Sequence, residues 1–91
     1  MLTKVKLALR ITTNAFDSEL NDLIDAAKLD LGIAGVETYP ADALVTRAII
    51  TYCRMHFGAP DEYDRLKASY DEQKAQLMTA TGYTTWIAAQ S

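Results

Sequence analysis

FDSELNDLIDAAKLDLGIA, residues 16–34, is the stretch of the sequence that decides the fold. At about 100° per residue, its apolar side chains fall in one stripe roughly 100° wide, which predicts an amphipathic helix. The stripe consists of Phe16, Leu20, Leu23, Ile24, Ala27, Leu31 and Ala34. Asn14 or Asp17 could cap the start of this helix, and Gly32 and Gly35 end it.

Two apolar residues of this helix, Leu29 and Ile33, lie off the stripe, on the polar side. In a monomer both side chains would be exposed, so we expect them to be candidates for contact with a neighbouring subunit. Acidic residues share this polar side: Glu19, Asp22 and Asp25. They form either a solvated face or a face that meets a basic partner.

The pattern of residues 40–57 predicts a second long helix, with Pro40 in its first turn and Asp42 two residues later. One apolar face holds Leu44, Val45, Ala48, Tyr52 and Met55, and the other holds Ile50, Cys53 and Phe57. Thin polar stripes, one of which includes Thr46, separate these faces. A helix with two apolar faces packs between layers, so this helix should be the central and most buried one.

Arg47 and Arg54 are seven residues apart and so project in nearly the same direction from the central helix. They make either surface ion pairs, which contribute little to stability, or a polar contact with the acidic helix of a neighbouring subunit. Both arginines are therefore candidate interface residues.

Two further helices complete the predicted fold. Residues 3–10 could form a short strand, but Leu, Lys, Ala and Arg dominate there and no second strand exists to pair with it, so a helix is favoured. Pro60 opens the last helix, and Thr81-Gly82 ends it. Its narrow apolar seam consists of Tyr63, Leu66, Tyr70 and Leu77.

The expected fold is all-α: a small bundle of three longer helices plus a short N-terminal one, in a body of residues 1–81.

Residues 82–91 form a separate, uncharged segment, which we expect to be an extended C-terminal arm. It contains Tyr83, Trp86 and Ile87, and aromatic residues of this kind are typical anchors at protein interfaces. The arm either docks on a partner or folds back over the core of its own domain. We expect the first, which makes these three residues candidates for partner docking.

Composition and charge argue against several classes of function. The net charge is −3, and the nine basic residues are spread along the chain without a cluster, which disfavours nucleic-acid binding.

The chain has one cysteine, Cys53, and one histidine, His56, three residues apart. No further Cys or His could complete a metal site around them, and no third group is suggested for catalysis. We expect no enzyme activity, cofactor or metal, and a soluble protein without a membrane span or signal peptide.

The order of these segments resembles a known family. The matching residues are Val5–Ile11, the turn Thr12–Asn14, the acidic run Glu19–Lys28, the helix Pro40–Phe57, and Ser69–Leu77 followed by Thr81–Thr84. Over essentially the whole chain they are similar to the head–tail connector proteins of tailed phages, also called adaptors or head-completion proteins. One departure is His56-Phe57-Gly58-Ala59-Pro60, where many members have an aromatic residue followed by Asn-Arg-Glu.

This resemblance implies a structural role. Members form rings beneath the portal at the head–tail junction of the virion, bridge head to tail and help to retain packaged DNA. The implied partners are the portal protein, a tail-side completion protein and further copies of the chain, which would be made in the host cytoplasm. No sequence-specific nucleic acid and no membrane are expected.

A small helical DNA-binding regulator, or a packaging-associated DNA-recognition domain, is the alternative. It would need a recognition helix with several outward basic or amide side chains. The helix at residues 40–57 offers only Arg47 and Arg54, and its two apolar faces suit it poorly to that task.

Overall fold

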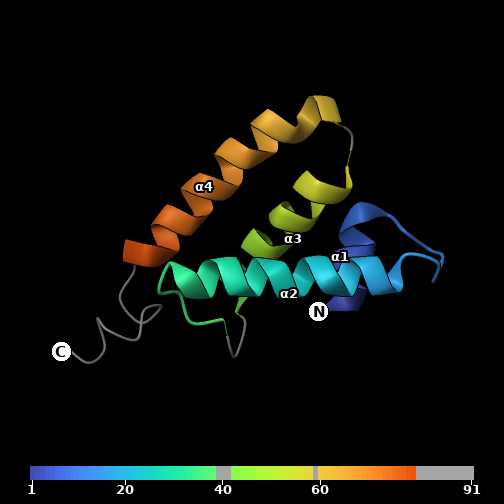
Figure 1. Cartoon of the computed structure of the whole chain (residues 1–91), viewed down its shortest axis with the longest axis horizontal. Coiled ribbons are helices and arrows are strands. Elements are labelled where there is room, and N and C mark those ends of the chain that lie inside the picture. Colours follow the sequence, from blue (N-terminus) through green and yellow to red (C-terminus); the bar gives the residue numbers. More distant parts are fainter. Residues whose placement is uncertain (39–41, 59, 80–91) are drawn as a thin grey trace.

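The computed structural model describes residues 1–38, 42–58 and 60–79 and shows a small helical bundle (Figure 1). Its helices are α1 (Leu2–Leu9), α2 (Asp17–Ile33), α3 (Ala43–Phe57) and α4 (Tyr63–Thr79), and a short 3-10 turn, η1 (Pro60–Glu62), leads into α4. These described ranges contain no β-strand, which confirms the predicted all-α fold class and the helical form of the first segment.

The central helix of the bundle is α3. It packs against α2, α4 and α1, and its contacts with α4 and α2 are the most extensive in the molecule. The buried residues of α3 are Val45, Thr46, Ala48, Ile49, Cys53 and Met55, a larger set than any other helix supplies. The two-faced pattern of the sequence therefore predicted the position of this helix correctly.

Several details of α3 differ from the sequence prediction. The helix begins at Ala43, and Asp42 is its N-cap residue, whose Oδ1 accepts a hydrogen bond from the Val45 N–H at 3.0 Å. Pro40 lies outside the described residues. Thr46 is buried and not part of an exposed polar stripe, because it shares a helix face with Ile49. Leu44 is 53% exposed and does not belong to the core.

Four residues of the predicted apolar stripe of α2 are buried, namely Leu20, Ile24, Ala27 and Leu31. Leu23 and Ala34 are partly buried, and Phe16 is 42% exposed and lies just before the helix. At its end, Gly35 adopts φ 89°, and the Val36 N–H donates to the Leu31 carbonyl at 2.9 Å. This is the hydrogen-bond pattern of a glycine C-cap, with the buried Val36 closing the helix end.

The predicted N-cap of α2 is wrong. Phe16 occupies that position, and its side chain makes no capping hydrogen bond. Both candidate caps instead bind Lys6 of α1: its Nζ lies 2.8 Å from an Asp17 carboxylate oxygen and donates to Asn14 Oδ1, also at 2.8 Å. These polar side chains join α1 to α2 and do not satisfy the amides of the first turn.

In α4 the buried residues are Leu66, Tyr70 and Leu77, and Tyr63 packs against the core, so the predicted seam is confirmed. The helix ends at Thr79. The predicted break at Thr81-Gly82 and the arm at residues 82–91 lie outside the described residues.

Candidate interaction surfaces

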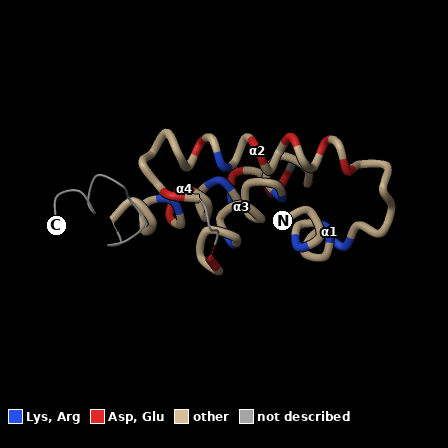
Figure 2. Tube along the Cα trace, turned by 90° about the horizontal axis from the view of Figure 1, so that it is seen from below, with Lys and Arg blue, Asp and Glu red and all other residues tan. Residues whose placement is uncertain are grey.

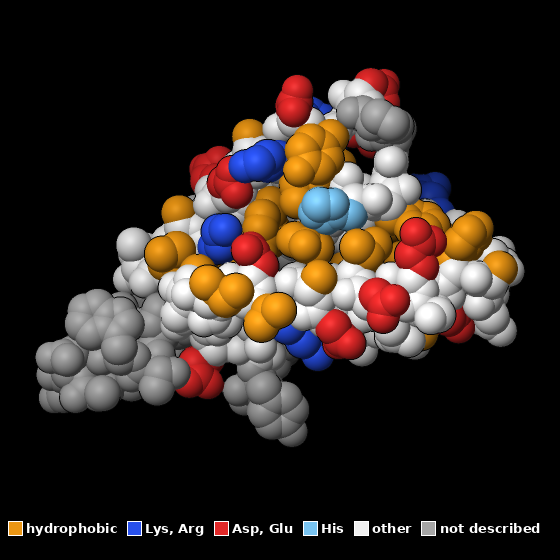
Figure 3. All heavy atoms as spheres, in the orientation of Figure 1, with side chains coloured by type: hydrophobic (Ala, Val, Ile, Leu, Met, Phe, Trp, Pro, Cys, Tyr) orange, Lys and Arg blue, Asp and Glu red, His pale blue; other side chains and the backbone are white. Residues whose placement is uncertain are grey.

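Two large apolar side chains protrude from the outer face of α2. Leu29 is 67% exposed and Ile33 is 79% exposed, on the side of the helix opposite its buried stripe. Figure 3 shows hydrophobic side chains on the surface along one half of α2 and acidic side chains along the other half. The expected exposure of these two residues is confirmed, and their contact with a neighbouring subunit stays a prediction.

Arg47 and Arg54 have different surroundings in the monomer. The Arg54 guanidinium donates a hydrogen bond to the carbonyl oxygen of Ala8 at 2.9 Å, which ties α3 to the last turn of α1. Because that carbonyl belongs to a helix end, a cation there is favourable. Arg54 therefore has a role within the monomer that its spacing from Arg47 did not suggest.

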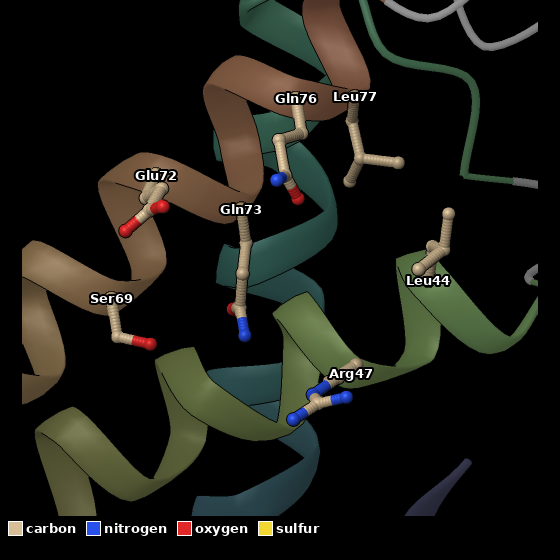
Figure 4. Close-up of a pocket in the computed structure, with 7 residues that line it drawn as sticks. All are labelled: Leu44, Arg47, Ser69, Glu72, Gln73, Gln76 and Leu77. Carbon is tan, nitrogen blue, oxygen red and sulfur yellow. The ribbon is translucent and has the colours of Figure 1, made fainter.

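Arg47 lines a groove of about 480 Å³ between α3 and α4 (Figure 4). The lining residues are Leu44, Arg47, Ser69, Glu72, Gln73, Gln76 and Leu77. Gln73 extends from α4 towards α3 in Figure 4, and its Oε1 is buried without a hydrogen bond from the described residues. Sequence analysis missed this groove, since it predicted a buried Leu44 and gave Gln73 no role.

A polar contact between α2 and α4 was also missed. The Tyr70 hydroxyl donates to an Asp30 carboxylate oxygen at 2.6 Å, and Lys74 Nζ lies 3.2 Å from the same oxygen. The hydrogen bond from Tyr70, helped by Lys74, holds the pKa of Asp30 below its usual value, against a smaller opposing effect of burial. Burial and the adjacent Asp30 carboxylate raise the pKa of Tyr70, so the phenol stays protonated. No local pattern links two residues that are 40 positions apart.

Cys53 and His56 have separate environments. Burial raises the pKa of the Cys53 thiol to about 11, so the thiol stays protonated and is a poor nucleophile at neutral pH. The exposed His56 ring packs on Tyr52, with ring centroids 4.5 Å apart, and on Tyr63 at 5.9 Å. In the described part of the chain, no group of three or more His, Cys, Asp or Glu side chains is placed to hold a metal ion.

The helices of residues 1–38, 42–58 and 60–79 include none that is long and apolar enough to cross a bilayer. Tyr83, Trp86 and Ile87, the candidate docking residues, lie outside these ranges.

One comparison with known proteins identifies the family of the chain. Searches of curated proteins and of solved structures found no match. A family model described as "Phage connector protein" matches residues 1–84, which include all four helices and the loops between them. The chain belongs to the phage connector protein family.

Proposed function

We propose that this protein is a head–tail connector subunit that forms a ring beneath the portal, bridges head to tail and helps to retain the packaged genome. The observation that carries the proposal is the family match over residues 1–84, since that family implies association with phage head and tail components. The role requires contact surfaces and no active site, and the protonated, buried thiol of Cys53 suits such a protein.

The exposed residues on α2 support self-association in the proposed ring. Full burial of a Leu or Ile side chain contributes roughly 1.5–3 kcal/mol, so a contact over Leu29 and Ile33 would supply a useful part of an interface. Arg47 is the second candidate, because it lies in the groove between α3 and α4. Arg54 would support the ring indirectly, by fixing α1 on α3.

The segment of residues 82–91 is the proposed docking arm, attached to a body of residues 1–81. It carries no charged side chain and contains Tyr83, Trp86 and Ile87. Burial of such aromatic anchors in a pocket of the portal would supply affinity without further charge pairs.

The negative charge of the chain suits passage of DNA through a ring. The net charge of the chain is −3, and a channel lined by negative charge would repel the phosphates of the duplex. The alternative function, a DNA-binding regulator, is less well supported. Of the two arginines that α3 offers, Arg54 donates to a backbone carbonyl, which leaves Arg47 alone for a phosphate or base.

Complementation of heads tests this function. Phage heads would be filled with DNA in cells that lack this protein, purified and incubated with the full chain or with buffer alone. We expect the full chain to increase the DNA that stays protected from nuclease and to allow added tails to produce infectious particles. If DNA retention and infectivity match the buffer control, the proposed function is wrong.

A further inference from the structure

The first helix has a basic outer face with an apolar residue at its centre. Lys4 and Leu7 of α1 and the C-cap residue Arg10, which adopts φ 60°, are exposed at three-residue spacing, and Leu7 is 74% exposed. The buried Val5 lies on the other side of α1, against the core. Residues 1–16 contain three basic and no acidic side chains. We call Lys4, Leu7 and Arg10 the α1 face.

The second helix has the opposite character on its outer face. Asp22, Asp25, Leu29 and Ile33 are exposed and lie within one side of α2, roughly opposite the buried Leu31. The whole helix contains five acidic residues and one basic residue. We call the four exposed residues the α2 face. Both faces therefore combine large exposed aliphatic side chains with charges, and these charges have opposite signs.

The positions of the two faces decide how copies of the chain could meet. Figure 2 shows α2 with its acidic positions along one edge of the molecule and α1 with its basic positions at the opposite edge. A surface that pairs with a different surface of the next copy gives a head-to-tail contact, and repetition of that contact closes a ring when the rotation between successive copies adds up to a full turn. A contact of two parallel α2 faces would instead bring Asp22 and Asp25 of both copies together, which is unfavourable, and an antiparallel contact centred on Leu29 would place Asp25 of each copy opposite Ile33 of the other, without a cation to pair with.

We propose that the α1 face of one copy packs on the α2 face of the next. This inference rests on the proposed ring and specifies which surfaces form it. With Leu7 over Leu29, one cation of the α1 face lies close to Asp25 in either relative direction of the helices. Lys4 precedes Leu7 by about one turn, Arg10 follows it at the helix end, and Asp25 precedes Leu29 by one turn.

Disulfide trapping of the full chain tests this pairing. Leu7→Cys and Leu29→Cys, one of them isotopically labelled, would be oxidised alone and as a mixture, and mass spectrometry would separate mixed from self-coupled dimers. The native Cys53 is buried, with a pKa of about 11, and should not react. Met78→Cys is the matched control, because Met78 is an exposed apolar residue outside both faces and outside the groove that Arg47 lines.

We expect a mixed Leu7→Cys/Leu29→Cys dimer in several-fold excess over self-coupled dimers and over the Leu7→Cys/Met78→Cys mixture. Asp25→Lys in the Leu29→Cys chain should lower the yield of the mixed dimer roughly fivefold, since it replaces an attraction by a repulsion. Lys4→Glu and Arg10→Glu together in the Leu7→Cys chain should restore the yield.

Electron microscopy of the wild-type chain with the portal shows whether rings form. This result distinguishes failure of the proposed pairing from failure of the proposed function. If rings form but the mixed dimer does not exceed the control, or Leu29→Cys couples mainly to itself, the pairing of these faces is wrong and the proposed function stands. If no ring forms and no mixed dimer appears, both are wrong.

Discussion

The hydroxyl of Tyr70 on α4 donates a hydrogen bond to the carboxylate of Asp30 on α2 at 2.6 Å. Tyr70→Phe removes this bond with little change in packing, because the ring stays buried. Asp30 remains partly exposed to water, so we expect the free energy of unfolding to fall by about 1 kcal/mol. That loss corresponds to a drop in Tm of roughly 4–8 °C, measurable by circular dichroism.

The same variant should show a dependence on pH. The pKa of Asp30 in the folded protein lies below its ordinary value of 3.8, so the stability from this contact is complete above about pH 4 and decreases as the pH falls through the lowered pKa. The difference in Tm between wild type and Tyr70→Phe should therefore shrink below about pH 4. Tyr63→Phe is the matched control, with little expected effect at any pH. A difference that grows in acid would contradict the role of Asp30 as a charged acceptor.

Two glycines at the end of α2 should respond to alanine in opposite directions. Gly35 adopts φ 89°, and an alanine in this left-handed conformation should cost about 1–2 kcal/mol. Gly32 lies within the helix with open space around it, so Gly32→Ala should stabilise the protein by about 0.5–1 kcal/mol. Urea unfolding measures both values, and equal effects of the two substitutions would argue against the helix end described above.

Alanine substitutions of Arg54 and Arg47 should also have different effects on stability. Arg54→Ala removes the hydrogen bond to the Ala8 carbonyl and should lower the free energy of unfolding by about 1 kcal/mol. Arg47→Ala should stay within about 0.5 kcal/mol of wild type, because its side chain lines an open groove and makes no hydrogen bond or ion pair with the described residues. The substitution should nevertheless weaken assembly. Chemical denaturation and sedimentation velocity measure the two properties. Loss of stability with Arg47→Ala alone would reverse this assignment.

Leu29→Asp should leave the fold intact, since the side chain is exposed, and should weaken association between subunits. The same substitution on the buried stripe, Ile24→Asp, should prevent stable folding because it buries a charge. Circular dichroism compares the folds, and electron microscopy of portal-bound rings compares assembly. Normal rings with Leu29→Asp would exclude this residue from the interface.

Trp86→Ala tests the proposed arm. At a partner interface, loss of an aromatic anchor costs about 2 kcal/mol or more, a roughly thirtyfold loss of affinity for the portal. The Tm of the free protein should change little. A loss of about 3–5 kcal/mol in the free energy of unfolding would instead assign Trp86 to the core of its own domain.

Periodicity of apolar residues was sufficient to predict the helices, because burial on one face is a local pattern. The stripe of α2 and the seam of α4 could be assigned from spacing alone, and so could the exposure of Leu29 and Ile33. The central position of α3 followed from its second apolar face.

Polar side chains were harder to assign because their partners come from other helices. Asn14 and Asp17 suited a helix cap, but Lys6 of α1 binds both. Thr46 was expected among polar neighbours, yet α3 is covered on enough sides to bury it. The contact of Arg54 with Ala8 and that of Tyr70 with Asp30 join distant positions, so only the packed helices reveal them.

The most direct test of the central claim is electron microscopy of the full chain mixed with the portal protein encoded in the same genome. We predict closed rings of this protein seated on the tail-facing side of the portal. Portal particles that remain bare at concentrations well above the micromolar range would contradict the assignment of this chain as a ring-forming connector.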